Sequence, residues 1–278
     1  MLNYDPVYMT YNNKPLAILN EMDNLTRQRE NAQEIFRKRK RLPLILFLAS
    51  LPLIILDLLF RLAGYQICIF TPVAVACWLG ALVYKMSMEH GRMRALPPRF
   101  YSTHEIIHTL RDDIDPKGRF FGTLDLTGSE QESKIVGQAK NAMGLDVTLY
   151  RDTWLSLKTK LYDGNMLRFS ASRRLKQRDR YSKRGQISGK IKWKPAKIKQ
   201  DSQELKVMLT INPQVYEIVP NRYLKQGAAL GPYSIRQVDI SNGIIQLNAV
   251  SSAQEIKSGD ILLILRAIYN ILNRKEMA

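Results

Sequence analysis

The chain has 278 residues, of which 45% are hydrophobic and 24% charged, with 42 Lys and Arg against 25 Asp and Glu. This composition excludes a disordered tail and a disulfide-stapled peptide, and the length allows one or two domains with a sizeable core. The formal net charge of +17 is informative only by region, because long apolar runs and one basic run both shape the average.

The N-terminal segment, residues 1–41, is expected to carry an amphipathic helix. Apolar side chains recur at near-helical spacing over residues 15–41, with Glu and Arg between them. The first dozen residues show no such pattern, and we expect them to be poorly ordered.

Two apolar runs of nineteen residues follow, 42–60 with one charge and 66–84 with none. Each has about the length needed to cross a hydrocarbon core, and the link between them is a short turn, so residues 42–96 are predicted to form a transmembrane helical hairpin. Lys and Arg flank the outer ends of both runs. The positive-inside bias therefore predicts a two-span protein with both termini cytoplasmic. No organelle-targeting pattern is present, which favours a prokaryotic inner membrane.

Single residues in this hairpin allow further expectations. Asp57 lies four residues before Arg61, as in an i, i+4 ion pair, although an ion or proton site is an alternative. Ala76 and Gly80 form a small-residue face that, with the amphipathic N-terminal segment, suggests a homo-oligomer. Cys77 and the other cysteine, nine positions earlier, would point to nearly opposite sides of a helix and cannot bridge.

After Pro97-Pro98 the composition becomes that of a globular domain, residues 97–278. The pattern predicts a helix over 103–115, a strand over 121–126, a helix from 129 to about 144, a hairpin of 155–161 and 167–171, a strand over 205–211, a hairpin of 233–240 and 244–250, and a helix over 258–273. Helices and strands do not alternate regularly, so the fold class is α+β with antiparallel hairpins and a C-terminal helix. Repeats and a glycine-rich phosphate loop are absent.

The most unusual feature is a basic run over residues 173–199, which contains twelve Lys and Arg and one acid, Asp179. Cations on alternate residues predict a hairpin, the basic arm, with a basic face and a partly apolar face that carries Leu175, Tyr181, Ile191 and Trp193. The residues expected to bind a polyanion are Arg174, Lys176, Arg178, Arg180, Lys183, Arg184, Lys190, Lys192 and Lys194. Tyr181 and Trp193 are the candidates for stacking.

Three interpretations of the basic arm compete. It engages anionic lipid or an acidic protein, it binds nucleic acid with the two aromatic residues stacked on bases, or it is a solvated loop without a ligand. The first two predict a membrane-anchored scaffold or binding protein rather than an enzyme, with no cofactor.

The sequence His104-Glu105-Ile106-Ile107-His108 predicts an alternative function. Histidines at i and i+4 of a helix can both ligate zinc, and the glutamate beside the first can act as general base, as in a membrane-tethered zinc metallopeptidase. A third ligand is not evident, since no histidine follows the motif, and Asp112 and Asp115 are the nearest candidates. The same five residues are also compatible with a purely structural helix or with incidental metal binding.

Overall fold

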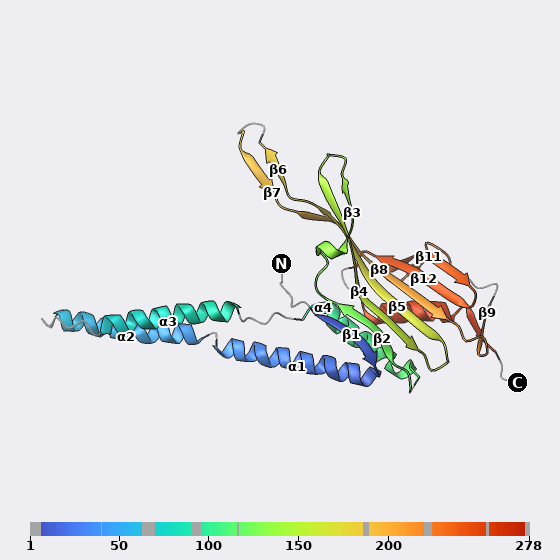
Figure 1. The fold of residues 1–278 in the computed structure, drawn as a ribbon, viewed down its shortest axis with the longest axis horizontal. Coiled ribbons are helices and arrows are strands. Elements are labelled where there is room, and N and C mark those ends of the chain that lie inside the picture. Colours follow the sequence, from blue (N-terminus) through green and yellow to red (C-terminus); the bar gives the residue numbers. More distant parts are fainter. Residues whose placement is uncertain are drawn as a thin grey trace. The chain divides into compact units, whose positions relative to one another are not determined.

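The computed structural model describes residues 7–39, 41–62, 70–90, 96–115, 117–185, 189–219, 224–253 and 256–275. The chain divides into two compact units. One contains Asp23–Leu96 and is helical; the other contains Asp5–Met22 with Pro97–Ala278 and has an α+β fold. Figure 1 shows the elements of each unit.

The structure confirms the N-terminal helix and the paired helices predicted from the sequence. Helix α1 spans Pro15–Arg39, and α2 (Leu42–Leu62) packs beside α3 (Phe70–His90). The ring of Phe47 stacks on Trp78 with 5.3 Å between centroids, and the Trp78 indole donates to the Ser50 hydroxyl. Two paired helices therefore stand where the spans 42–60 and 66–84 were expected, but no helix in the described part of the chain is long and apolar enough to cross a membrane.

Most of the large apolar side chains on α2 and α3 do not pack within the helix pair. Leu44, Ile45, Leu48, Ile55, Leu58, Leu59, Leu62, Leu79, Leu82, Val83 and Met86 are each more than half exposed. Ala76 and Gly80 are also exposed, so the small-residue face is not used between α2 and α3. The side chains of Asp57 and Arg61 and the first cysteine lie outside the described residues.

The α+β unit is built on a nine-stranded antiparallel sheet. Its order is β1 (Tyr8–Asn13), β2 (Phe120–Asp125), β4 (Asp146–Lys160), β5 (Met166–Arg178), β8 (Lys197–Thr210), β12 (Ile244–Ser251), β11 (Tyr233–Ser241) and β10 (Ala229–Leu230), with β3 (Ile135–Lys140) beside β4. Two small sheets pair β6 (Tyr181–Arg184) with β7 (Ile191–Lys194), and β9 (Tyr216–Ile218) with β13 (Leu272–Arg274).

One face of the sheet forms the core, and the other is polar. Leu157, Phe169 and Val207 alternate along β4, β5 and β8 with exposed side chains and are almost fully buried. Helices α4 (Pro98–Leu110) and α5 (Ser258–Tyr269) contact each other and contribute buried isoleucines to this core. Buried and exposed side chains therefore alternate along the strands. The result is a two-layer unit, with helices on one face of the sheet and the other face open to solvent.

Both hairpins predicted around Asp163-Gly164 and Asn242-Gly243 are present. Asn242 and Gly243 have φ values of 49° and 73°, the left-handed conformations of a two-residue turn that matches the twist of the flanking strands. The predicted helix at 103–115 is confirmed as α4 with a 3₁₀ turn, η1 (Arg111–Asp113).

Three sequence predictions are wrong. The expected helix from 129 to 144 is only a 3₁₀ turn, η2 (Glu132–Lys134), followed by β3, because the Ser129 hydroxyl donates to Asp152 instead of capping a helix. The first dozen residues are not disordered throughout, since β1 pairs with β2. The C-terminal helix ends at Tyr269, because Leu272–Arg274 pairs with β9.

Candidate functional site

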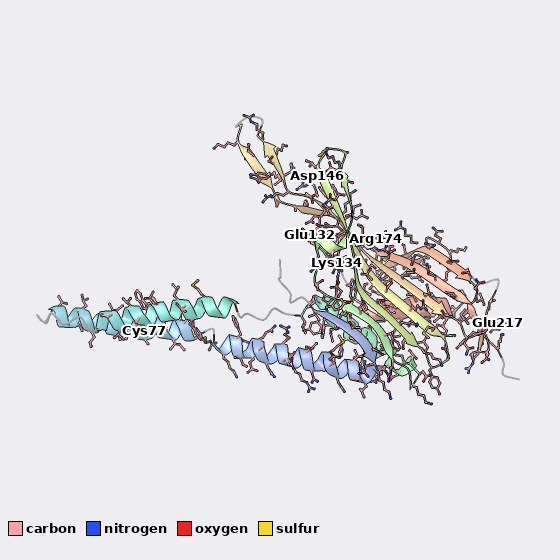
Figure 2. All side chains as sticks on the ribbon, viewed as in Figure 1. Cys77, Glu132, Lys134, Asp146, Arg174 and Glu217 are labelled. Atoms are coloured by element: carbon pink, nitrogen blue, oxygen red, sulfur yellow. The ribbon has the colours of Figure 1, made fainter. Side chains whose placement is uncertain are left out.

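The base of the basic arm is electrically neutralised on both faces. Arg173 donates from Nε to Asp201 at 2.7 Å and also from Nη2. Arg174, labelled in Figure 2, donates twice to Glu204 at 2.8 Å. Each carboxylate stands diagonally across from its arginine in the β5–β8 register, a position from which long side chains reach each other. Arg174, one of the residues predicted to bind a polyanion, is therefore paired within the protein.

The distal arm is the β6–β7 hairpin, and its register differs from the predicted division into a basic and an apolar face. Tyr181 pairs with Lys194 and Lys183 with Lys192, so these four side chains share one face. Ser182 pairs with Trp193, and Arg184 with Ile191, on the other face. Both faces consequently carry cations, and Tyr181 and Trp193 lie on opposite faces. The prediction failed because the hairpin register places Tyr181 opposite Lys194, and not opposite Trp193.

Seven predicted cations are exposed and have no carboxylate partner among the described residues: the arginines Arg180 and Arg184 and the lysines Lys176, Lys183, Lys190, Lys192 and Lys194. We refer to the five lysines as the distal lysines; Lys176 lies near the end of β5, and the other four lie in or next to the β6–β7 hairpin. A lysine without an internal partner attracts an external anion with its full positive charge. In an arginine that is paired with a carboxylate, the negative charge of the partner cancels most of this attraction.

The distal arginines are arranged around the two aromatic rings. The Arg178 guanidinium lies over the Tyr181 ring at 4.6 Å and donates to the Pro195 carbonyl at 2.8 Å. Arg180 lies over the Trp193 ring at 5.0 Å, and Arg184 donates to the Gly189 carbonyl at 3.2 Å. These contacts hold the planar groups in place while the Trp193 side chain stays 65% exposed.

The only acid of the arm is not available to neutralise the distal lysines. Asp179 accepts hydrogen bonds of 3.0 and 3.1 Å from the Thr148 hydroxyl, and its backbone N–H donates to the Asp146 carbonyl. These contacts fasten the base of the arm to the start of β4.

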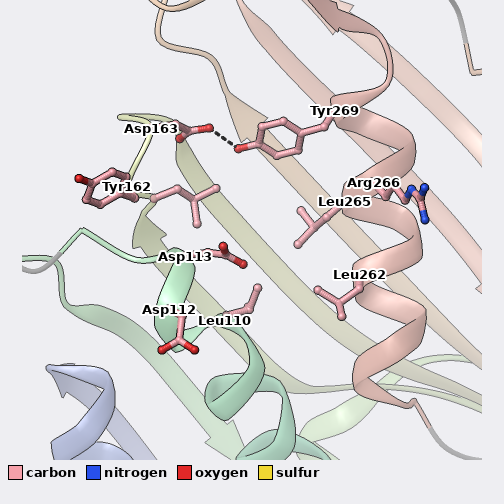
Figure 3. Close-up of a pocket in the computed structure, with 10 residues that line it drawn as sticks. Leu110, Asp112, Asp113, Tyr162, Asp163, Leu262, Leu265, Arg266 and Tyr269 are labelled. Carbon is pink, nitrogen blue, oxygen red and sulfur yellow. Dashed lines mark hydrogen bonds between the residues drawn. The ribbon is translucent and has the colours of Figure 1, made fainter. Parts of the chain in front are cut away.

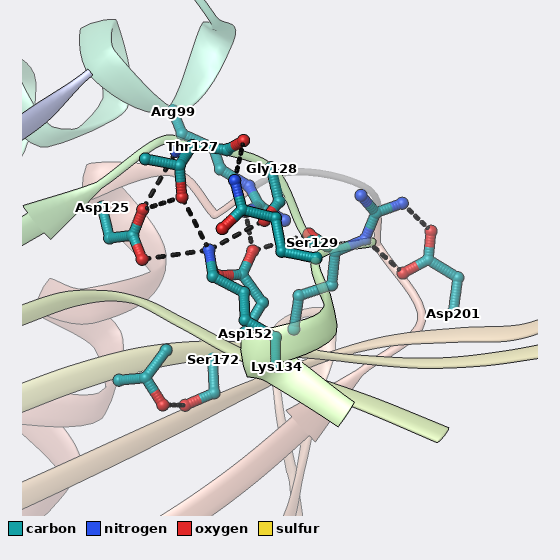
Figure 4. A network of polar contacts seen from close by, with 12 residues as sticks. Arg99, Asp125, Thr127, Gly128, Ser129, Lys134, Asp152, Ser172 and Asp201 are labelled. Carbon is teal, nitrogen blue, oxygen red and sulfur yellow. Dashed lines mark hydrogen bonds and ion pairs between the residues drawn. The ribbon is translucent and has the colours of Figure 1, made fainter. Parts of the chain in front are cut away.

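A second polar cluster, at the junction of α4, β2 and β4, was missed from the sequence (Figure 4). Asp152 is 1% exposed and accepts from Arg99 at 3.0 Å, Ser129 at 2.6 Å and Lys134 at 2.7 Å. Lys134 also bonds Asp125 at 3.0 Å, so two cations and two carboxylates balance. The sequence signal that could have revealed this cluster was Asp152, an acid at an inward-facing position of a strand. Such an acid does not by itself identify the residues that pair with it.

Burial and hydrogen bonding act in opposite directions on the charges of this cluster. Burial lowers the pKa of the Arg99 guanidinium, and the nearby Asp152 only partly restores it. Burial would raise the pKa of Asp125, but hydrogen bonds from Thr127 and Lys134 outweigh burial and hold that pKa below its usual value. The cluster is a closed, neutral network with a structural role.

The predicted zinc motif lies on α4 and faces solvent in part. The rings of His104 and His108 stack with 6.4 Å between centroids, and Glu105 accepts a hydrogen bond of 2.7 Å from Ser258 on α5. Asp112 is 78% exposed and pairs with Arg111. No group of three or more potential ligands converges in the described part of the chain. The buried isoleucines between the histidines pack in the core, as expected of a structural helix.

A cavity of about 550 Å³ lies between the end of α4, the β4–β5 turn and α5 (Figure 3). Its walls include Leu110, Leu161 and Leu262, with Asp163 and Tyr269 at one end. The Tyr269 hydroxyl donates to Asp163 at 2.7 Å, and burial raises the pKa of that hydroxyl. The tyrosine thus remains a neutral donor that is already engaged with its neighbour.

Comparisons of the chain with protein-family models, curated proteins and solved structures found no match. Function is therefore inferred from the residues of the chain itself, and the distal lysines are its most specific feature.

Proposed function

We propose that the protein is a membrane-associated scaffold or binding protein whose basic arm engages a polyanion. The observation that carries this proposal is the contrast along the arm. Acidic partners neutralise the arginines at its base, whereas the distal lysines are exposed and unpaired among the described residues. A hairpin that carries such charges is arranged to meet an external anion.

The helical hairpin supports the membrane part of the proposal. Large apolar side chains cover the outside of α2 and α3, and a contiguous apolar surface of this kind is stable only against lipid or another protein. We propose that this surface is buried in a lipid bilayer; the proposal does not require that either helix crosses it. Basic residues flank the hairpin at both ends, and their attraction to the anionic lipid of the cytoplasmic leaflet favours the cytoplasmic side. A homo-oligomer and a prokaryotic inner membrane remain predictions.

The polyanion-binding role is tested with the full chain in detergent and fluorescently labelled polyphosphate as the probe. Binding is expected to weaken steeply with salt. Replacing all five distal lysines by Gln should weaken it by at least about tenfold, because each exposed cation contributes a fraction of a kcal/mol to about 1 kcal/mol.

A control variant removes three cations from elsewhere in the same unit, against five in the arm. Lys158, Arg168 and Lys206 are exposed on the open face of the sheet and have no ion pair within the residues described. Their triple replacement by Gln should leave binding within about twofold, after allowance for the general loss of charge. Equal losses in both variants would contradict the proposal, because binding would then follow net charge and not the arm.

A further inference from the structure

Two hairpins project from the same end of the α+β sheet. The β6–β7 hairpin extends the arm, and the β3–β4 hairpin stands beside it (Figure 1). Their bases are held together, because Val147 on β4 pairs with Arg178 on β5 and the Asp179 N–H donates to Asp146. The two tips therefore belong to one edge of the unit.

Each hairpin exposes large apolar side chains where a solvated loop would carry polar ones. On β7, Ile191 is 67% and Trp193 65% exposed, and at the β3–β4 turn Met143 is 84% exposed. Asn141 orders that turn by accepting from the Met143 and Leu145 N–H groups at 2.8 and 3.0 Å. An ordered edge that combines exposed Trp, Ile and Met with unpaired lysines suits the interface of a bilayer, where indoles lie at headgroup level and cations contact anionic lipid.

The distribution of side chains on β6 and β7 distinguishes lipid from nucleic acid. A single strand stacked on aromatic side chains needs them on one face, but Tyr181 and Trp193 lie on opposite faces. Arginine guanidinium groups already cover both rings from one side. Phosphates along a nucleic acid also provide no favourable environment for exposed Ile191, whereas a fluid bilayer surrounds an inserted edge on all sides and accommodates cations on both faces.

We propose that this edge docks on an anionic lipid bilayer, with Trp193, Ile191 and Met143 entering the headgroup region and the distal lysines contacting lipid phosphates. This inference rests on the proposed polyanion-binding role of the arm and names its partner. The two β-tips are a contact separate from the helical hairpin, so they require their own test.

The test uses the full chain in lipid nanodiscs made of phosphatidylcholine alone or mixed with phosphatidylglycerol, with acyl chains brominated close to the headgroup. The signal from Trp193 is isolated as the difference in fluorescence between the natural chain and a Trp193→Phe variant, which removes the contributions of Trp78 and Trp154. In anionic discs we expect Trp193 emission to be blue-shifted and quenched by bromine. In neutral discs or at high salt, the blue shift and the bromine quenching of Trp193 should disappear.

Substitutions then connect docking to the lysines. The variant Lys183→Gln/Lys192→Gln/Lys194→Gln should lower the ratio of docked to undocked arm by roughly 100-fold, because each lysine near an anionic surface contributes about a fivefold factor. The open-face variant Lys158→Gln/Arg168→Gln/Lys206→Gln should retain Trp193 quenching. Unchanged thermal unfolding of both variants confirms that exposed positions were altered without loss of the fold.

Two results would overturn the inference and are distinguishable. If Trp193 is unquenched in anionic discs while the distal lysines still bind a labelled oligonucleotide or polyphosphate, the lipid assignment is wrong and the polyanion-binding role stands. If neither lipid nor soluble polyanion responds to the distal lysines, both the inference and the proposed function are wrong.

Discussion

Asp152 on β4 joins two segments that are distant from it in the sequence. Its carboxylate accepts from Arg99 at the start of α4, from Ser129 after β2 and from Lys134 in η2. Arg99 also lies over the Trp154 ring at 5.1 Å. A buried ion pair is costly to form, but removing one member leaves a charge without compensation. The cluster therefore specifies how α4 meets the sheet.

Replacing Asp152 by Ala is expected to lower the free energy of unfolding by about 3–5 kcal/mol, because Arg99 would remain largely buried without its carboxylate and Lys134 would keep only Asp125. Urea unfolding of the full chain in detergent measures this. Asp112→Ala, at a 78% exposed side chain, is the control and should change the free energy by no more than about 0.5 kcal/mol. Similar values for the two variants would show that the cluster contributes little.

Asp125 predicts a pH dependence of stability. Its pKa in the folded protein is lowered, whereas in the unfolded chain it should be near the usual value of about 3.9. Its contribution is therefore complete above that value and is lost as pH falls through the lower, folded-state pKa. The stability difference between the natural chain and Asp125→Asn should stay constant above about pH 5 and shrink as pH falls below about 3.9 toward the folded-state pKa. A difference that stays constant or grows in acid would refute this.

The histidines on α4 give a direct test of the zinc peptidase prediction. Metal analysis by mass spectrometry should show near-equimolar zinc, lost in His104→Ala/His108→Ala, if the motif is a metal site. We expect no such difference between the two proteins, because Glu105 is bonded to Ser258 and the motif packs Ile106 and Ile107 in the core. If the natural protein contains zinc and the double variant does not, α4 would instead be the functional site.

At the scale of elements, the sheet depends on a close approach between β2 and β4. Gly122 faces Leu157 in the register, and a Cβ at this glycine would lie 1.8 Å from the Ser156 carbonyl oxygen. Backbone cannot move aside as a flexible side chain can, so this position excludes every other residue type. The pairing in turn supports β1, which occupies the other side of β2.

Gly122→Ala should therefore destabilise the sheet by more than about 3 kcal/mol, the upper part of the usual cost of overpacking. Gly137→Ala is a matched control on β3, the other neighbour of β4, where a Cβ meets only the Leu149 side chain at 3.9 Å. This control should leave stability unchanged or raise it slightly, because glycine weakens a strand interior. Unfolding midpoints of the two variants decide the matter, and equal midpoints would contradict a steric clash at Gly122.

At the scale of the whole molecule, two units of different surface chemistry share one chain. The α+β unit buries its apolar side chains between two helices and one face of a sheet, whereas α2 and α3 leave most of theirs exposed. Burial of exposed apolar area is the dominant favourable term in association. The helical hairpin is consequently the part of the molecule that requires an apolar environment.

The natural protein is expected to remain in the membrane pellet after extraction at alkaline pH. A Leu48→Gln/Ile55→Gln/Leu59→Gln variant should shift substantially to the supernatant, because each replaced side chain loses about 1.5–3 kcal/mol of favourable burial in lipid. Leu262→Gln/Leu263→Gln on α5, at 39% and 45% exposed positions, is the control and should stay in the pellet. A natural protein found in the supernatant would refute the membrane proposal.

Local patterns in the sequence were sufficient for the elements whose stabilising contacts are close along the chain. The helix of residues 15–41, the pair of apolar helices, and the hairpins at Asp163-Gly164 and Asn242-Gly243 follow from periodicity and turn chemistry, which act over a few residues. The concentration of positive charge in the arm is likewise a property of composition and needs no fold.

Tertiary structure decided whatever depended on partners distant in the chain. The β1 strand forms only because β2 is beside it, and Ser129 does not begin the predicted helix because its hydroxyl donates to Asp152. In the arm, the sequence determined how many cations are present, whereas strand register determined which of them Asp201 and Glu204 neutralise and which face each aromatic ring occupies. Pairing between distant strands costs chain entropy, and only the contacts of the assembled sheet offset this cost. Local sequence patterns therefore do not determine which strands pair or in which register.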